Sequence, residues 1–107
     1  INKVIEQAQF FLGKYDLSAF RSINCQSKSA IKSIRSFDIK TIKDEIFFNI
    51  SAKSFLHSQV RIMIGTLIDI GLGKISKPIS EIISLKKREY AGVTAPPHGL
   101  YLTKVEY

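Results

Sequence analysis

The side chains that could act as nucleophiles or metal ligands are few in this sequence and lie far apart. Cys25 is the single cysteine, and the two histidines are His57 and His98. Zinc sites use pairs of ligands separated by about two to four residues, and the sequence has no such pair. One cysteine and two scattered histidines also form no recognisable Cys–His nucleophile arrangement. The sequence therefore predicts no metal site, and Cys25 is best interpreted as a small buried or half-buried thiol.

The segment Gly71-Leu72-Gly73-Lys74 has the residue types of a phosphate-binding loop but not their spacing. A P-loop requires another glycine five residues before its Gly-Lys pair, and this sequence has Ile68 there. Serine or threonine must follow the lysine, and Ile75 follows instead. The two glycines therefore indicate the end of a helix rather than a nucleotide site.

Arg61 is the most informative single residue, because it lies beside the apolar stripe of an expected helix with no local acid. The residues three and four positions away are His57, Ser58, Ile64 and Gly65, so no ion pair within the helix can hold the guanidinium. Gly65, one turn further on, leaves room for another backbone segment to approach closely. Two interpretations remain open. Arg61 binds a carboxylate or phosphate from another segment, or it extends along the surface into water.

Composition indicates one small globular domain with a basic surface. The chain has 107 residues, 45% hydrophobic and 23% charged, which excludes a disordered tail, and its net charge is +7. Between positions 14 and 43, seven basic residues face two acids, and serine and threonine hydroxyls are interleaved. Such a stretch suits a phosphate backbone, although a solvated lysine-rich surface is an equally good interpretation. The basic residues are Lys14, Arg21, Lys28, Lys32, Arg35, Lys40 and Lys43.

The N-terminus shows no basic region followed by an apolar run and a small-residue cleavage site, and the sequence has no apolar stretch long enough to span a membrane. One cysteine allows no disulfide within the chain, which suits a reducing compartment, so we expect a cytoplasmic protein. The chain begins at Ile1, in the middle of a helical pattern and without methionine. We therefore expect it to be a fragment of a longer protein.

The hydrophobic pattern predicts helices that cover one face of a largely antiparallel sheet, which is an α+β fold. We expect an N-terminal helix ended by Gly13, a polar irregular stretch over 14–28, and two strands over 30–43 and 46–53 that form a hairpin. A long helix capped by Ser54 should run to about Leu72. A third helix should open at Ser76 and Pro78 and carry its basic residues in the last turns. A constrained loop over 94–99 and a final strand over 100–107 complete the expected elements. The predicted buried stripe of the long helix is Leu56, Val60, Met63, Ile64, Leu67 and Ile68.

Four blocks of the sequence resemble, in order, the signatures of the A-type tRNA pseudouridine synthases. Together they cover essentially all 107 residues. The two strongest blocks are Phe55-Leu56-His57-Ser58-Gln59-Val60-Arg61-Ile62-Met63-Ile64-Gly65 and Ala91-Gly92-Val93-Thr94-Ala95-Pro96-Pro97-His98-Gly99-Leu100-Tyr101-Leu102. Weaker blocks lie at 13–21 and 29–34.

The resemblance implies that residues 1–107 form the C-terminal domain of such an enzyme, one of its two similar domains. The intact enzyme would convert uridine to pseudouridine in the anticodon stem-loop of tRNA, as a homodimer with no metal or cofactor. Arg61 matches the family arginine that pairs with the catalytic aspartate, and Leu100 matches the leucine that packs beneath the target base. The family's Gly-Arg-Thr-Asp string, which carries that aspartate in the N-terminal domain, is not in this sequence. We therefore expect this fragment to bind tRNA and complete the active site, and to be inactive alone.

Two other functions remain as alternatives. The chain could be a free-standing, non-catalytic RNA-binding module that uses its cations and sheet surface. A membrane-surface protein is a weaker alternative, because the sequence has no strongly amphipathic basic helix with aromatic anchors. The reading frame upstream of Ile1 distinguishes the first two functions, since an in-frame Gly-Arg-Thr-Asp segment indicates the enzyme.

Overall fold

The computed structural model describes residues 2–22, 29–43, 45–52 and 58–95. In chain order, the helices and strands are α1 (Asn2–Ala8), β1 (Gly13–Asp16), β2 (Ile31–Ile42), β3 (Glu45–Ala52), α2 (Gln59–Gly71) and α3 (Ile79–Leu85). Short 3-10 helices occupy Gln9–Phe11 (η1), Ser18–Phe20 (η2) and Arg88–Tyr90 (η3). The expected α+β class is confirmed.

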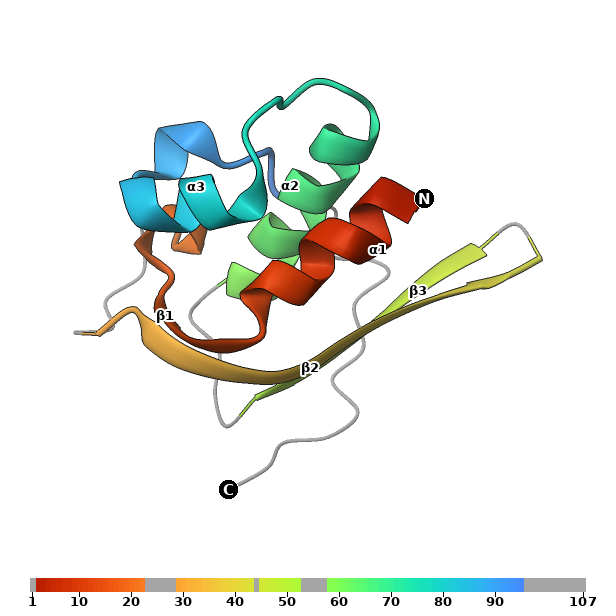
Figure 1. The fold of residues 1–107 in the computed structure, drawn as a ribbon, viewed down its shortest axis with the longest axis horizontal. Coiled ribbons are helices and arrows are strands. Elements are labelled where there is room, and N and C mark those ends of the chain that lie inside the picture. The colour runs from red at the N-terminus through yellow and green to blue at the C-terminus, as the bar shows by residue number, and fades with distance from the viewer. Residues whose placement is uncertain (1, 23–28, 44, 53–57, 96–107) are drawn as a thin grey trace.

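The three strands form an antiparallel sheet in the order β1-β2-β3, and α1, α2 and α3 gather over one of its faces (Figure 1). Ile34 lies opposite Ala52 and Phe37 lies opposite Ile50, so these side chains share the face that the helices cover. Asp38 and Lys40 are exposed on the opposite face, because side chains alternate along a strand. A register shift between Ile34 and Ser36 marks a β-bulge.

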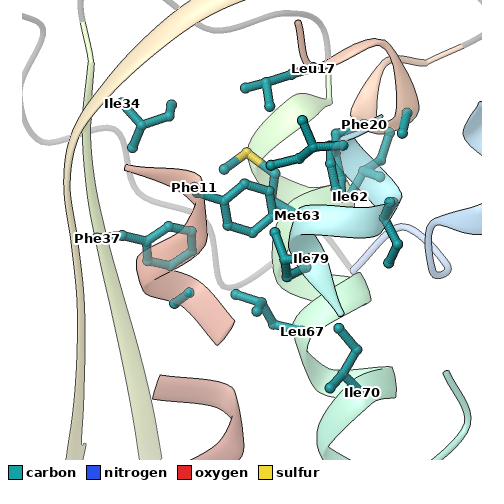
Figure 2. Packing of buried hydrophobic residues seen from close by; sticks show 14 of the residues in the cluster. Phe11, Leu17, Phe20, Ile34, Phe37, Ile62, Met63, Leu67, Ile70 and Ile79 are labelled. Carbon is teal, nitrogen blue, oxygen red and sulfur yellow. The ribbon is translucent and has the colours of Figure 1, made fainter. Parts of the chain in front are cut away.

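Aromatic side chains from three elements meet in the core (Figure 2). The ring of Phe11 packs edge-on against Phe20, at 4.9 Å between centroids, and stacks on Phe37 at 5.6 Å. Met63 and Leu67 of α2 are fully buried in the same cluster. The core therefore joins the N-terminal segment, the sheet and α2, and it holds α2 in a fixed orientation over the sheet.

The predicted hairpin is confirmed by β2 and β3, and residues 14–22, the described part of the stretch predicted to be irregular, are more regular than expected. Gly13 adopts φ +114°, and the chain then enters β1, which pairs with the start of β2. A four-residue strand whose first three residues are all exposed carries no alternation of apolar and polar residues that could distinguish it from a loop in the sequence.

The long helix begins later than predicted, at Gln59, because Ser58 takes the left-handed conformation with φ 58°. Its buried face is also rotated from the predicted stripe. Ile62 and Ile70 are buried in the core, whereas Ile68 is 40% exposed. Ser54 and Leu56 lie outside the described residues.

The interpretation of the glycines near 71–74 as a helix end is confirmed. Gly73 adopts φ +78°, its N–H donates to the carbonyl of Ile70, and the N–H of Lys74 donates to the carbonyl of Asp69. These two bonds form a Schellman motif, which needs a residue that tolerates positive φ.

The third helix starts after Pro78 as expected, but its predicted basic last turns are wrong. The helix ends at Leu85, and Lys86 takes a left-handed conformation as the C-cap. Arg88 belongs to the separate 3-10 helix η3.

The predicted last strand and most of the loop before it lie outside the described residues. No helix in the described part of the chain is long and apolar enough to cross a membrane.

Candidate active-site arginine and the segment that holds it

Arg61 lies in the first turn of α2, where its position is set by how the helix begins. The N–H of Ile62 donates to the carbonyl of Ser58 over 3.0 Å, which closes the first turn. Ile62 and Met63 anchor this turn in the core. Arg61 precedes them on the adjoining, partly exposed side of the helix. The sequence therefore places the guanidinium at the margin of the core, where it can reach both protein and solvent.

Residues 92–95 run alongside this turn, and Ala95 makes two hydrogen bonds with Arg61. The Nε–H of Arg61 donates to the carbonyl oxygen of Ala95 over 2.8 Å. The N–H of Ala95 donates to the carbonyl oxygen of Arg61 over 3.0 Å. Within the described ranges, Arg61 forms no ion pair, and its two terminal amino groups have no hydrogen-bond partner. No described residue therefore occupies the edge of the guanidinium that could form a bidentate pair.

Gly65 and Gly92 allow this close approach between α2 and residues 92–95. A Cβ at position 65 would overlap the carbonyl oxygen of Val93 and lie 3.2 Å from the nitrogen of Ala95. A Cβ at position 92 would lie 2.8 Å from the Cα of Thr66. Both contacts are with backbone atoms, so neither neighbour can rotate away. The close backbone approach that the sequence suggested at Gly65 is confirmed.

Thr66 and Asp69 hold the same segment from the next turns of α2. The buried Thr66 hydroxyl donates to the carbonyl of Ile62 over 2.7 Å and accepts the N–H of Gly92 over 2.9 Å. The Asp69 carboxylate accepts the N–H of Val93 over 3.4 Å. Sequence reasoning missed Thr66. Its only signal was a small polar residue beside Gly65, on a helix face that should otherwise be apolar.

A second arginine reaches the same segment from η3. Arg88 donates from Nη2 to the Thr94 hydroxyl over 3.4 Å. Arg61 and Arg88 therefore contact consecutive residues, Ala95 and Thr94, from different elements. Two guanidinium groups and one carboxylate, that of Asp69, contact residues 92–95, so positive groups outnumber negative ones on this segment, which favours an anionic partner.

The expected basic stretch spreads over β1, the loop after it and β2 instead of forming one cluster. Lys14, Arg35, Lys40 and Lys43 are exposed, and Lys28 lies outside the described residues. Lys14 pairs in register with Ser33 on the face that the helices leave open. This face also carries Asp38, so its charge is mixed.

Asp16 has a structural explanation that needs no catalytic role. The Ser18 hydroxyl donates to its carboxylate, as does the Ser18 N–H over 3.0 Å, so Asp16 closes a turn between β1 and η2. These hydrogen bonds, with Lys86 and Arg21 nearby, hold the pKa of Asp16 below its usual value despite partial burial. The lowered pKa of Asp16 is therefore explained by the hydrogen bonds of the turn and does not indicate a catalytic acid.

Several predicted residues lie outside the described residues, namely Leu100, Cys25, His57 and His98. In the described ranges, no three His, Cys, Asp or Glu side chains gather closely enough to hold a metal ion. The absence of a metal site therefore stays a prediction for the whole chain.

Comparison with known proteins gives one consistent family. A family model described as tRNA pseudouridine synthase matches residues 7–107. Proteins named tRNA pseudouridine synthase A from Neorickettsia sennetsu and Anaplasma phagocytophilum are 49% and 48% identical to this chain over its full length. The protein of the same name from Ehrlichia chaffeensis is 45% identical. In each case the matched part is 44% of the relative, so the chain spans less than half their length.

Proposed function

The chain belongs to the tRNA pseudouridine synthase family, and we propose that it supplies Arg61 to the active site of the full-length protein. The observation that carries this proposal is the geometry of Arg61. Its Nε–H is occupied by the carbonyl of Ala95, while its terminal amino groups have no partner among the described residues. A guanidinium fixed at Nε presents those amino groups in a defined direction, which suits bidentate pairing with a carboxylate.

The partner we propose is the catalytic aspartate that the family resemblance expects in the preceding domain. An arginine beside a carboxylate favours the ionised form and lowers the pKa of that group. The ionised aspartate would attack the nucleoside while the bond between uracil N1 and the ribose breaks. The uracil would then turn, and its C5 would bond to the ribose carbon as the bond between that carbon and the aspartate breaks. The hydrogen on C5 would pass to water as a proton, and N1 would take up a proton from water. Arg61 would orient the carboxylate throughout.

We also propose that this half of the enzyme helps bind the anticodon stem-loop of tRNA. The net charge of +7, and Arg88 beside Thr94, support a phosphate-bearing partner. Leu100 would pack beneath the target base once it leaves the stack, and it follows Ala95 by five residues. We further propose that the full-length protein is a cytoplasmic homodimer that needs no metal or cofactor.

The test is pseudouridine formation by the full-length protein on tRNA transcripts labelled with tritium at uracil C5. Each conversion releases one tritium to water, so the count measures turnover without antibodies or sequencing. We expect release from transcripts that carry anticodon stem-loop uridines, and none from matched transcripts with cytidine at those positions. Tight tRNA binding without tritium release would contradict the proposal and favour the non-catalytic RNA-binding module.

A further inference from the structure

The hydroxyl of Thr66 is the most buried polar contact between α2 and residues 92–95. Thr66 is 0% exposed, and its Oγ1 lies 2.9 Å from the Gly92 nitrogen and 2.7 Å from the Ile62 carbonyl oxygen. The hydroxyl therefore donates a hydrogen bond to a carbonyl of its own helix and accepts one from an N–H of the neighbouring segment. If the hydroxyl were removed, the N–H of Gly92 would be buried without this acceptor.

Thr66 and Arg61 hold opposite ends of the same four residues. Thr66 binds the segment at Gly92, Asp69 binds it at Val93, and Arg61 binds it at Ala95. Gly65 lies between Thr66 and Arg61 and brings the two backbones into contact. Only two residues separate Gly92 from Ala95, so the backbone connects the Thr66 anchor to the carbonyl that fixes the Arg61 guanidinium.

We propose that Thr66 is a positioning residue, which sets the direction of the Arg61 guanidinium by fixing residues 92–95 against α2. The inference rests on the proposed function of Arg61, since the consequence for catalysis depends on it. The structural part of the inference, which we call the mechanical part, is that Thr66 fixes residues 92–95 and thereby the Arg61 guanidinium. It does not depend on the proposed function. The two parts are therefore measured separately.

The first experiment tests the mechanical part in the full-length protein without tRNA. Thr66→Val removes the hydroxyl and keeps the shape, Thr66→Ser keeps the hydroxyl, and Thr41→Val makes the same chemical change at an exposed position on β2. We expect Thr66→Val to speed hydrogen exchange of the Arg61 Nε–H, seen by NMR, and of the Gly92 and Ala95 amides. The expected change is about tenfold, as for the loss of one buried hydrogen bond. Thr66→Ser and Thr41→Val should stay near the wild type. Unchanged exchange at Arg61 in Thr66→Val would overturn the proposal.

The second experiment tests whether Thr66 acts through Arg61, with tritium release as the readout. We expect Thr66→Val to lower kcat about tenfold at saturating tRNA, with KM nearly unchanged, and Thr66→Ser to restore it. In an Arg61→Met background the effect should nearly vanish, because methionine has no N–H to give to the carbonyl of Ala95. An equal loss of kcat in both backgrounds would show a merely structural role and overturn the proposal. An inactive wild type would instead refute the proposed function, while the exchange experiment still decides the mechanical part.

Discussion

Replacing Gly65 by alanine perturbs the contact between α2 and residues 92–95 at its tightest point. Helix propensity alone predicts a gain of about 1 kcal/mol, because alanine is the better residue inside a helix. The structure predicts the opposite sign. The new methyl group would overlap the carbonyl oxygen of Val93, so residues 93–95 must move away from the helix.

That displacement affects three hydrogen bonds, two between Arg61 and Ala95 and one from Val93 to Asp69. Each is worth about 1 kcal/mol net, so their loss costs about 3 kcal/mol. After the gain in helix propensity, we expect Gly65→Ala to lower the free energy of opening of this region by about 2 kcal/mol.

The assay is amide hydrogen exchange of the full-length protein in increasing urea, which reports the free energy of opening segment by segment. Gly71→Ala is the matched control, because a methyl group there would meet only the Cγ2 of the Val4 side chain, which can rotate. Residues 92–95 should lose protection in Gly65→Ala and keep it in Gly71→Ala. A Gly65→Ala protein at least as protected as the wild type would refute this account of the contact.

Three further predictions concern a buried hydrogen bond, a turn and the binding of tRNA. Gln7→Leu should destabilise the protein by about 1–3 kcal/mol in urea unfolding, because the Gln7 side-chain oxygen accepts the buried N–H of Ile79 over 2.8 Å; an unchanged midpoint would contradict this. Asp16→Ala should cost about 1 kcal/mol at neutral pH, through loss of the turn at Ser18. Because the folded state lowers the pKa of Asp16, its charged form stabilises the fold above the ordinary aspartate pKa of about 4. That contribution is lost as the pH falls through the lowered value. The stability gap between wild type and Asp16→Ala should therefore narrow below about pH 4, and a gap that widens there would contradict the assignment. Binding of tRNA by the full-length protein should weaken steeply with salt, and a filter-binding curve independent of salt would count against phosphate contacts.

The β2–β3 hairpin and the start of the third helix show what local patterns predict well. Alternating apolar residues predicted β2 and β3 to within about two residues, because a half-buried strand has a simple period. The buried face and the beginning of α2 were harder to predict from the sequence. Its buried face includes the polar residues Gln59 and Thr66, and the apolar Ile68 is exposed beside it. The apolar residues alone therefore predicted a buried stripe that is rotated from the observed buried face. The beginning of α2 depends on the left-handed backbone of Ser58, which no residue type required.

In the candidate site, too, some residues could be predicted from the sequence and others could not. Arg61 was found because it lacked a local acid, and Gly65 because a helix gains nothing from a glycine unless something approaches it. Thr66, Asp69 and Arg88 were not found, since each acts on residues 92–95 across 6 to 26 positions of sequence. Long-range hydrogen bonds of this kind leave no periodic signal, and only the folded arrangement reveals them.

The proposed function requires Arg61 to act on catalysis through the charge and the fixed orientation of its guanidinium group. Its most direct test is the single-turnover rate of pseudouridine formation by the full-length protein with saturating tRNA. We expect Arg61→Ala to lower this rate about 100-fold or more, as for loss of a preorganised electrostatic group, with tRNA affinity and thermal unfolding close to the wild type. Arg61→Lys should fall between the two, because it keeps the charge without the bidentate geometry. A near-normal rate in Arg61→Ala would contradict the account.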